Sequence, residues 1–413
     1  MIKIDTPQDC CGCNACVQRC PKQCITMHCD QEGFWYPVVN EQECINCGLC
    51  EKTCPVLHPK TESKPLKTYA AINKNEDIRL ASSSGGVFTI LAEETLKQGG
   101  VVFGAAFNKN WEVEHIAVES IEELKRLRGS KYVQSNIGNC YKEAEQYLKK
   151  GRKVLFSGTP CQIAALKLFL NKDYENLTTI DIVCHGTPSP KVWKMYLEEI
   201  AAKLFKNIPD KKNQYVSPTG ETYKSCIEAI SFRSKITGWK KYSFLLKLNF
   251  PNYDGKNTAV FAEDLHKNSF MQCFLANLCL RPSCYACPAR GGKSGSDITL
   301  ADLWGAEQIT PHIDDDKGIS LLFIRNNKIE IPCCELHEIA YNDALTYNPS
   351  IEKDVAIPAK RKDFFKKLYK KGMYTATKEC LHRSWFTILW EKIMWNINNR
   401  VINNLWKVKK QEY

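Results

Sequence analysis

The sequence lacks long hydrophobic runs. None of its 413 residues lies in an uninterrupted apolar stretch of about eighteen residues, the length that suggests a membrane-spanning helix. The first residues, Met1–Asp5, contain no apolar core of the kind that a secretion signal requires. We therefore expect a cytoplasmic protein with no membrane-spanning segment.

The sequence also lacks several signatures of enzymes and nucleic-acid binders. It has no Walker loop, no G-x-G-x-x-G turn, no zinc-finger pair and no RNA-binding signature. No Ser-His-Asp arrangement and no carboxylate pair stands out, so we assign no catalytic side chain. Nucleic acid is not an expected partner.

Cysteine, in contrast, is abundant, with 22 residues. A secreted chain would use so many cysteines for disulfides. Without a secretion signal, clustered cysteines indicate metal ligands or redox thiols instead.

Two stretches near the N-terminus repeat one cysteine spacing. They are Cys10-x2-Cys13-x2-Cys16-x3-Cys20-Pro21 and Cys44-x2-Cys47-x2-Cys50-x3-Cys54-Pro55. Bacterial ferredoxins with two 4Fe–4S clusters have this run, and its fourth cysteine ligates the other cluster. Paired zinc sites, the alternative, rarely use a doubled, proline-ended run. We predict one cluster on Cys10, Cys13, Cys16 and Cys54, and another on Cys44, Cys47, Cys50 and Cys20.

Beyond the cysteine repeats, residues 59–67 are polar with two prolines and predict a linker. Strands are then expected at 69–72, 101–107, 153–157, 179–183 and 298–301, and helices at 87–96 and after Ser120-x-x-Glu123, which has capping-box form. We predict an α+β chain: a small N-terminal two-cluster ferredoxin fold at 1–58, a larger mixed α/β body and a C-terminal helical tail.

A serine–glycine turn precedes the helix expected at 87–96. Its residues, Ser82-Ser83-Ser84-Gly85-Gly86, are small enough for backbone N–H groups to approach an anion at the helix start. A phosphate-bearing cofactor would suit this position. An ordinary capped helix start is the alternative.

Four further cysteines stand at predicted loop positions of the body, namely Cys161, Cys184, Cys284 and Cys287. Two of them follow strands, and strand ends gather at one edge of an α/β sheet, where ligands usually bind. Four thiolates would complete a third cluster. A redox-active CxxC pair or inert buried thiols are the alternatives.

Several charged and aromatic residues have two interpretations each. Asp302 and Trp304 follow a predicted strand and either position a substrate or belong to the structural core. His185 either tunes a cluster beside Cys184 or is an ordinary buried histidine. Arg233 and Lys235 either bind phosphates or acidic groups or form surface ion pairs.

Eight stretches of the body stand out together: Ser82–Val87, Gly129–Gln134, Gly158–Gln162, Cys184–Gly186, Phe232–Lys235, Arg281–Cys287, Ser296–Gly305 and Lys317–Ser320. In this order they resemble one known family, the coenzyme F-420 (deazaflavin) hydrogenase/dehydrogenase beta subunits with an N-terminal ferredoxin domain. The resemblance implies a body in two parts, 68–150 and 151–374.

The resemblance also implies a set of cofactors. These are FAD and a third 4Fe–4S cluster, with coenzyme F-420 or NAD(P)H as co-substrate. The flavin site would be lined by Ser83, Ser84, Gly85, Gly86, Lys131 and Tyr132. The segment Ala289–Ser296 departs from the family pattern, and its glycine and serine content predicts a mobile loop.

Charge and the tail bear on partners. Residues 1–60 carry five Lys or Arg against seven Asp or Glu, whereas the remainder has a net charge of +13. Such a body would attract an acidic redox protein or anionic lipid, or be basic only for solubility.

The tail, 375–413, has apolar residues at four-residue steps and predicts an amphipathic helix. It would bind the inner membrane face, dock a partner or pack on its own body.

These expectations combine into one hypothesis. The chain is an iron–sulfur flavoprotein oxidoreductase that moves electrons between a hydride carrier and 4Fe–4S clusters through FAD. A redox carrier or partner oxidoreductase completes the reaction. The alternative is an electron-transfer subunit without a substrate site of its own, serving polysaccharide biosynthesis at the membrane surface.

Overall fold

The computed structural model describes residues 1–205, 224, 226–249, 258–327 and 329–381. Within these ranges, no helix is both long and apolar enough to cross a bilayer. The predicted tail, 375–413, begins inside the last described helix, α14 (Met373–Leu381), and its remainder from residue 382 lies outside the described residues.

An N-terminal module holds the two cysteine repeats. Its secondary structure is a 3-10 turn (Pro7–Asp9), α1 (Ala15–Arg19), the antiparallel pair β1 (Ile25–Cys29) and β2 (Trp35–Val39), and α2 (Leu49–Lys52). Each helix starts after a residue in the left-handed conformation, Asn14 or Gly48. Both short helices therefore begin with a sharp reversal inside a cysteine loop.

The body is built on an eight-stranded sheet with the order β13-β3-β12-β11-β7-β6-β4-β5. Its strands are β3 (Lys67–Asn73), β4 (Val101–Phe107), β5 (Val113–Val118), β6 (Val154–Gly158), β7 (Leu177–Ile182), β11 (Ile298–Asp302), β12 (Ser320–Ile324) and β13 (Cys334–Glu338). The central strands β4, β6, β7 and β11 are parallel, and the outer pairings are antiparallel. The carboxyl ends of the parallel strands consequently share one edge.

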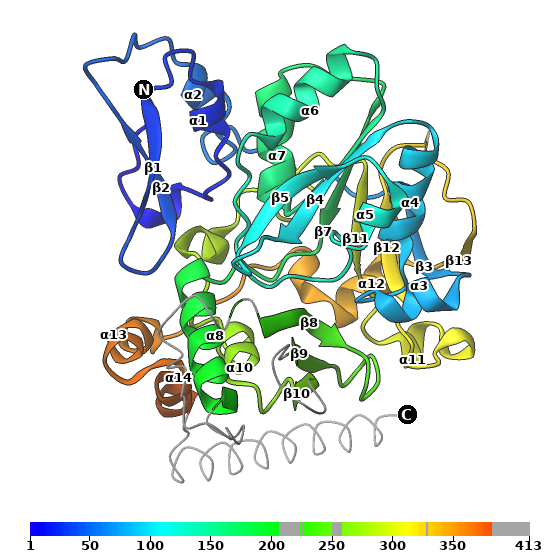
Figure 1. Ribbon diagram of the computed structural model, residues 1–413. Helices are drawn as coiled ribbons and strands as arrows, with labels where there is room; N and C mark the ends of the chain where they lie inside the picture. The colour runs from blue at the N-terminus through cyan, green and yellow to red at the C-terminus, as the bar shows by residue number, and fades with distance from the viewer. Residues whose placement is uncertain (206–223, 225, 250–257, 328, 382–413) are drawn as a thin grey trace, which may run out of the picture.

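Helices cover both faces of this sheet (Figure 1). On one face, α6 (Cys140–Lys149) and α7 (Pro160–Leu170) pack on Phe103 and Phe156. On the other, α4 (Val87–Lys97) and α5 (Ile121–Leu124) pack on Val102 and Leu155. Successive strand residues point to opposite faces, so burial of both faces explains the continuous apolar runs of these strands.

A second layer of elements lies beside the sheet. It contains a three-stranded antiparallel sheet of β8 (Ile227–Ser234), β9 (Ser243–Asn249) and β10 (Thr258–Asp264). The helices here are α8 (Pro190–Phe205), α10 (Ser269–Leu275), α13 (Arg361–Lys371) and α14. An aromatic core that includes Trp193, Phe232, Phe244 and Phe270 joins these elements.

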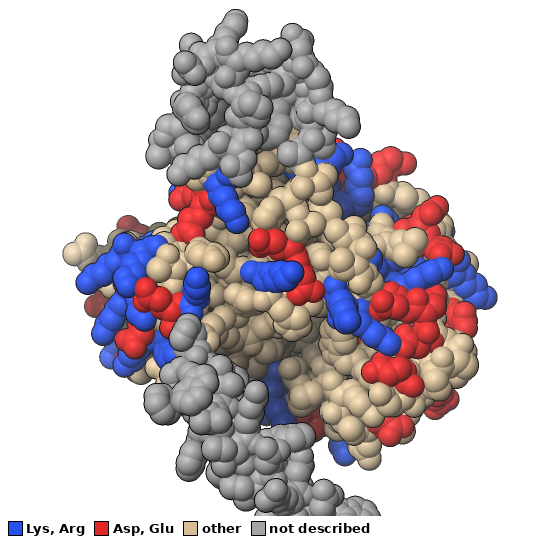
Figure 2. Space-filling view, turned by 90° about the horizontal axis from the view of Figure 1, so that it is seen from below, with Lys and Arg blue, Asp and Glu red and all other residues tan. Residues whose placement is uncertain are grey.

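Shorter elements complete the body. Helices α3 (Glu76–Ala81), α11 (Ala306–Ile309) and α12 (Tyr341–Tyr347) are accompanied by 3-10 turns at Pro282–Ala286, Pro311–Ile313 and Pro349–Ile351. On the face seen in Figure 2, Lys and Arg lie beside Asp and Glu. The positive charge of the body is therefore not gathered into one continuous patch on that face.

The N-terminal module is bound to the body by buried polar contacts. The guanidinium of Arg361, on α13, forms a two-pronged ion pair with the Glu32 carboxylate. Gln18, on α1, accepts bonds from the backbone N–H groups of Tyr141 and Lys142 on α6. These bonds join residues more than 100 positions apart, so they hold the module at a defined position on the body.

Candidate functional site

The first predicted cluster set lies in the N-terminal module, next to the body. Burial raises the pKa of the Cys16 thiol to about 12, and the neighbouring thiols Cys10 and Cys54 contribute to that rise. Cys13 is buried as well. A hydrogen bond with Cys11 lowers its pKa, but burial and the Cys16 and Cys10 thiols raise it, and the net pKa is raised. Four thiolates this close repel one another, and the iron ions of a cluster would offset that repulsion. The donor set fits a 4Fe–4S cluster.

The second predicted set surrounds a narrow cavity of its own. Cys20, Cys44, Cys47 and Cys50 all line this cavity, together with the exposed Ile45. Within the described part of the chain, no three Cys, His, Asp or Glu side chains lie close enough to hold a single metal ion. Cluster thiolates bind different irons and lie further apart than the ligands of one ion. The cysteines of the second set thus share one cavity.

The four body cysteines converge although they come from three distant segments. Burial raises the pKa of Cys184 well above its usual range, and the thiols of Cys284, Cys161 and Cys287 all add to that shift. Burial likewise raises the pKa of Cys287 to about 12, with Cys161 and Cys284 contributing. The arrangement fits the third cluster that the resemblance implies.

A junction connects the first cysteine set with the four body cysteines, which form the third set. The Cys11 thiol, which the ferredoxin spacing does not use, lies within hydrogen-bonding reach of both Cys13 and Cys161. Thr159, just before Cys161, lies 3.3 Å from the Cys161 sulfur through its hydroxyl oxygen. The first set is thus the one that faces the body cysteines.

Arg281 fixes this junction from the body side. Its side chain is fully buried and donates to the carbonyl of Cys10 at 2.7 Å, the amide oxygen of Gln134 at 3.0 Å and the carbonyl of Trp35 at 2.9 Å. Gly12 makes this close approach possible, because a Cβ there would lie 2.3 Å from the Gln134 side-chain nitrogen. Sequence reasoning included Arg281 only in the matching stretch Arg281–Cys287 and predicted no role for it.

A cavity of about 410 Å³ opens at the carboxyl edge of the parallel strands. This volume lies in the range of small-molecule sites. Its lining brings together stretches that the resemblance named, including Ser83, Ser84, Gly86, Lys131, Tyr132, Cys184, His185, Asp302 and Trp304. One cavity therefore runs from the serine–glycine turn to a ligand of the third set.

The serine–glycine turn presents the start of α4 to this cavity. Gly86 is the N-cap residue, with φ of 83°, and no side chain caps the helix. The free N–H groups and positive dipole end of α4 suit a phosphate. Gly85 does not line the cavity. A Cβ on Gly85 would lie 2.3 Å from the carbonyl oxygen of Ala71 on β3, so its role is close packing on the sheet.

Two cations lie on the same side as the turn. Lys131 donates to the carbonyls of Leu127, Arg128 and Gly129 at 3.1 to 3.4 Å, and burial lowers its pKa to about 7. Arg128 also lines the cavity and donates to the hydroxyl of Thr89 on α4. A lysine with this pKa gains from a neighbouring anion, so these residues fit a phosphate-bearing cofactor.

The aromatic wall of the cavity includes Tyr132. Its ring stacks on Phe274 with centroids 4.7 Å apart, and its hydroxyl accepts a bond from Arg233 at 3.3 Å. Arg233 pairs with the Asp302 carboxylate at 2.6 Å and lies 3.9 Å over the ring of Tyr242. Because Arg233 is buried, the interpretation as a surface ion pair is wrong, whereas the one as a partner of an acidic group is confirmed.

Two histidines line the cavity in different ways. The His185 Nε2 lies 2.6 Å from the Asn277 side-chain oxygen, and burial lowers the pKa of His185. His115 is buried and contacts the Ser157 carbonyl and the Ser135 hydroxyl, and burial lowers its pKa to about 4. Sequence reasoning did not single out His115, since nothing near it in the sequence marks it.

Comparisons with known proteins agree with the resemblance. The family model described as "Coenzyme F420 hydrogenase/dehydrogenase, beta subunit" matches in two parts, its N-terminal model over residues 68–140 and its C-terminal model over 151–341. A "4Fe-4S binding domain" model matches residues 37–57.

One curated relative and one solved structure are similar to this chain. A subunit of the F(420)H(2) dehydrogenase of Methanosarcina mazei is 26% identical over 180 residues, which are 41% of this chain and 51% of the relative. The chain thus spans about half the length of that relative. A chain in the F420-reducing [NiFe] hydrogenase complex of Methanosarcina barkeri shares 15% identity, with 64% of this chain and 77% of that chain covered and a TM-score of 0.39.

Proposed function

Because the chain belongs to the family of coenzyme F420 hydrogenase/dehydrogenase beta subunits, which are oxidoreductases, and carries a 4Fe-4S binding domain, we propose that it is an iron–sulfur flavoprotein that exchanges electrons with a hydride carrier. FAD, when bound, supplies the change between two-electron and one-electron chemistry, and 4Fe–4S clusters carry single electrons. The protein supplies their positions and surroundings.

The cavity residues support this proposal through their separate tasks. The start of α4, with Arg128 and Lys131 beside it, would hold the phosphates of FAD. Tyr132, stacked on Phe274, offers an aromatic wall for the planar ring system. The Arg233–Asp302 pair keeps a buried charge compensated at the same wall.

A single observation carries the proposal. The same cavity is lined by the serine–glycine turn and by Cys184, which lies among the other three body cysteines. A cofactor anchored at the turn would therefore lie next to the third cysteine set. The Cys11 junction then links that set to the N-terminal module.

Cofactor content tests the proposal. Protein purified without oxygen should contain about twelve iron atoms, four for each cluster, and one FAD. Cys184→Ser should lower the iron to about eight without affecting the N-terminal clusters. Cys140→Ser, at a buried thiol bonded to the His115 carbonyl, should keep the full iron content. About eight iron atoms and no flavin in the unmodified protein would contradict the proposal.

The co-substrate and the partner follow from the relatives' names. The curated relative is named as a dehydrogenase of F(420)H(2) and as a subunit, so we propose a reduced deazaflavin as hydride donor, NAD(P)H as the second choice, and a partner oxidoreductase or redox carrier. Flavin reduction by each donor in rapid mixing would distinguish them. No observation on the described residues favours the alternative of an electron-transfer subunit in polysaccharide biosynthesis.

A further inference from the structure

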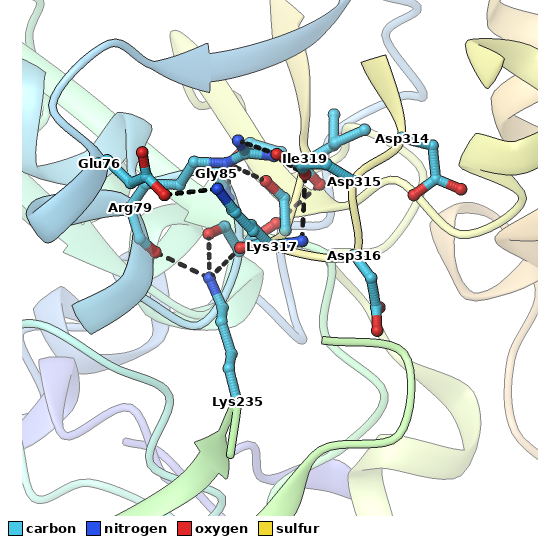
Figure 3. Close-up of polar contacts among 12 residues, drawn as sticks. Glu76, Arg79, Gly85, Lys235, Asp314, Asp315, Asp316, Lys317 and Ile319 are labelled. Carbon is cyan, nitrogen blue, oxygen red and sulfur yellow. Dashed lines mark hydrogen bonds and ion pairs between the residues drawn. The ribbon is translucent and has the colours of Figure 1, made fainter. Parts of the chain in front are cut away.

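Three backbone segments meet around the ammonium group of Lys235 (Figure 3). Lys235 directly follows β8. Its Nζ donates to the carbonyls of Arg79 at 2.7 Å, Ser84 at 2.8 Å and Lys317 at 2.6 Å. These carbonyls belong to α3, the serine–glycine turn and the loop before β12.

The three bonds use the full donor capacity of the ammonium group. A lysine has three N–H donors, and each one here serves a main-chain carbonyl. An ammonium group withdrawn from water is costly unless its donors are satisfied. The arrangement therefore holds only while all three segments keep their positions relative to one another.

A second cation reinforces the same arrangement. Arg79 donates through Nε to the Gly318 carbonyl at 2.8 Å and forms a two-pronged ion pair with Asp315 (Figure 3). A Cβ on Gly318 would lie 2.7 Å from the Lys235 Nζ, in a backbone conformation with φ of 103°. Only glycine leaves room for the ammonium group at this position.

The serine–glycine turn is also bonded on its other side. The Ser84 hydroxyl donates to the Ile319 carbonyl at 2.8 Å, and the Gly85 N–H donates to the Ser320 hydroxyl at 2.9 Å. Ser84 is thus fixed through both its carbonyl and its side chain. The N–H groups that begin α4 follow within three residues, so their direction is set before a ligand arrives.

We propose that Lys235 is a positioning residue for the cavity: its ammonium group holds the Ser82–Gly86 turn in the shape that receives the phosphate-bearing part of FAD. This inference rests on the proposed function. Lys235 does not line the cavity and acts through Ser84.

The charges around Lys235 give the proposal a pH dependence. The pKa of Lys235 is lowered to about 8, mainly by burial and also by Arg79 and Arg233, whereas Asp302 and Asp315 act in the opposite direction. A neutral amine has two N–H donors and cannot serve three carbonyls. Well below pH 8 the ammonium group should therefore keep all three hydrogen bonds. As the pH rises through 8, one of these hydrogen bonds should be lost.

Substitution of the lysine tests the proposal. Lys235→Met keeps the length of the side chain but removes every donor. When the full-length protein is stripped of flavin and titrated with FAD, the FAD dissociation constant of this variant should be at least about tenfold higher than that of the unmodified protein. Lys235→Arg retains the charge and should recover most of the affinity. Iron content, measured on the same samples, should be unchanged in both variants.

The matched control is Lys317, whose backbone carbonyl accepts a hydrogen bond from Lys235. The exposed Lys317 side chain pairs with Glu76 on α3 rather than with the turn, so Lys317→Met should leave the FAD dissociation constant within about twofold of the unmodified value. Equal affinity of Lys235→Met and the unmodified protein would overturn the proposal. Equal loss in Lys235→Met and Lys317→Met would do the same.

A pH series provides a second test that needs no Lys235→Met protein. The FAD dissociation constant of the unmodified protein, divided by that of Lys235→Arg, should rise above pH 8, since arginine does not titrate there. Lys131, with its pKa of about 7, titrates in both proteins and cancels in this ratio. A constant ratio would overturn the proposal. Failure of the unmodified protein to bind FAD at any pH would instead contradict the proposed function, and this inference with it.

Discussion

At the scale of single residues, Gly12 combines two constraints. Its φ is 68°, and a Cβ would come within 2.3 Å of the Gln134 side chain and 2.7 Å of the Arg281 guanidinium. Gly12→Ala should therefore cost both backbone strain and lost packing, about 2–4 kcal/mol in the free energy of unfolding. Thermal and urea unfolding of the iron-loaded protein measure this change.

Gly48 separates these two contributions. Its φ is 70°, yet a Cβ there would meet only the Glu51 carboxylate at 3.8 Å. Gly48→Ala should therefore cost only the strain, about 1–2 kcal/mol. Equal losses for Gly12→Ala and Gly48→Ala would show that contact with the body contributes nothing at Gly12.

His115 gives the protein an acid sensitivity. Its pKa in the folded state is about 4, below the usual value of about 6.5, because burial disfavours the charged form. Its contribution to stability is therefore complete above pH 6.5 and is lost as the pH falls towards 4. Between pH 7.5 and pH 5, the free energy of unfolding should drop by about 2 kcal/mol on this account.

Replacement of the histidine isolates its share of that drop. His115→Gln should show a smaller loss between the two pH values than the unmodified protein in urea unfolding. His58→Gln, at an exposed position, should leave the loss unchanged. A loss of the same size in His115→Gln would mean that other groups cause the acid sensitivity.

At the scale of elements, the cap of α3 stabilises the segment that carries Arg79. The Asn75 side chain accepts a bond from the Ile78 N–H at 3.1 Å. Asn75→Ala should destabilise the protein by about 1 kcal/mol in urea unfolding. Asn139 holds the same position before α6 but makes no side-chain cap bond, so Asn139→Ala should have almost no effect. Indistinguishable losses would contradict the cap.

Elements buried on both sides were predictable because apolar residues dominate them, most clearly in β4. The strand expected at 101–107 has these bounds in the structure, and those expected at 153–157 and 179–183 lie within one or two residues of β6 and β7. The placement of β3 between β12 and β13 was not predicted, since residue periodicity carries no information on which strands pair. The small sheet β8–β10 was also missed.

The segment Ala289–Ser296 shows where composition misleads. Its glycines and serines predicted a mobile loop, but Ser294 and Ser296 are buried, and the Ser294 hydroxyl donates to the buried Asp181 carboxylate on β7. Small residues serve here for close packing against a strand. The prediction of a mobile loop is wrong because composition does not distinguish an open loop from a tightly packed one.

At the scale of the whole molecule, Arg281 joins the N-terminal module to the body. Arg281→Met removes three hydrogen bonds at a fully buried position. It should weaken the binding of the module to the body by about 3–5 kcal/mol. In calorimetry, the module should then unfold in a separate transition at lower temperature, and proteases should cut more readily within 59–67.

A half-buried arginine of the body provides the comparison for Arg281. Arg152 pairs with Glu119 and donates to the carbonyls of Gly99 and Gly100 within the body, so Arg152→Met should lower the free energy of unfolding by about 1–3 kcal/mol but leave one joint transition. A single transition at unchanged temperature in Arg281→Met would contradict the proposed role of Arg281 in seating the module.

The candidate sites differ in how far the sequence could predict them. The N-terminal cysteines follow a local spacing, so their ligand sets could be proposed directly. The body set depends on contacts between segments as distant as Cys161 and Cys287, so their positions at strand ends left a cluster as one of three alternatives, and the resemblance then favoured it. The Arg281 junction and the Lys235 ammonium site depend on carbonyl groups, whose positions no side-chain pattern encodes.

The two kinds of cysteine set also imply an order of maturation during protein synthesis. All eight ligands proposed in the module have left the ribosome once Cys54 has, and N-terminal domains generally fold first. The body set is complete only after Cys287 has been made. If the module binds the proposed clusters, iron and sulfide can enter it while the rest of the chain is still being translated, and Arg281 is made only after the module is complete.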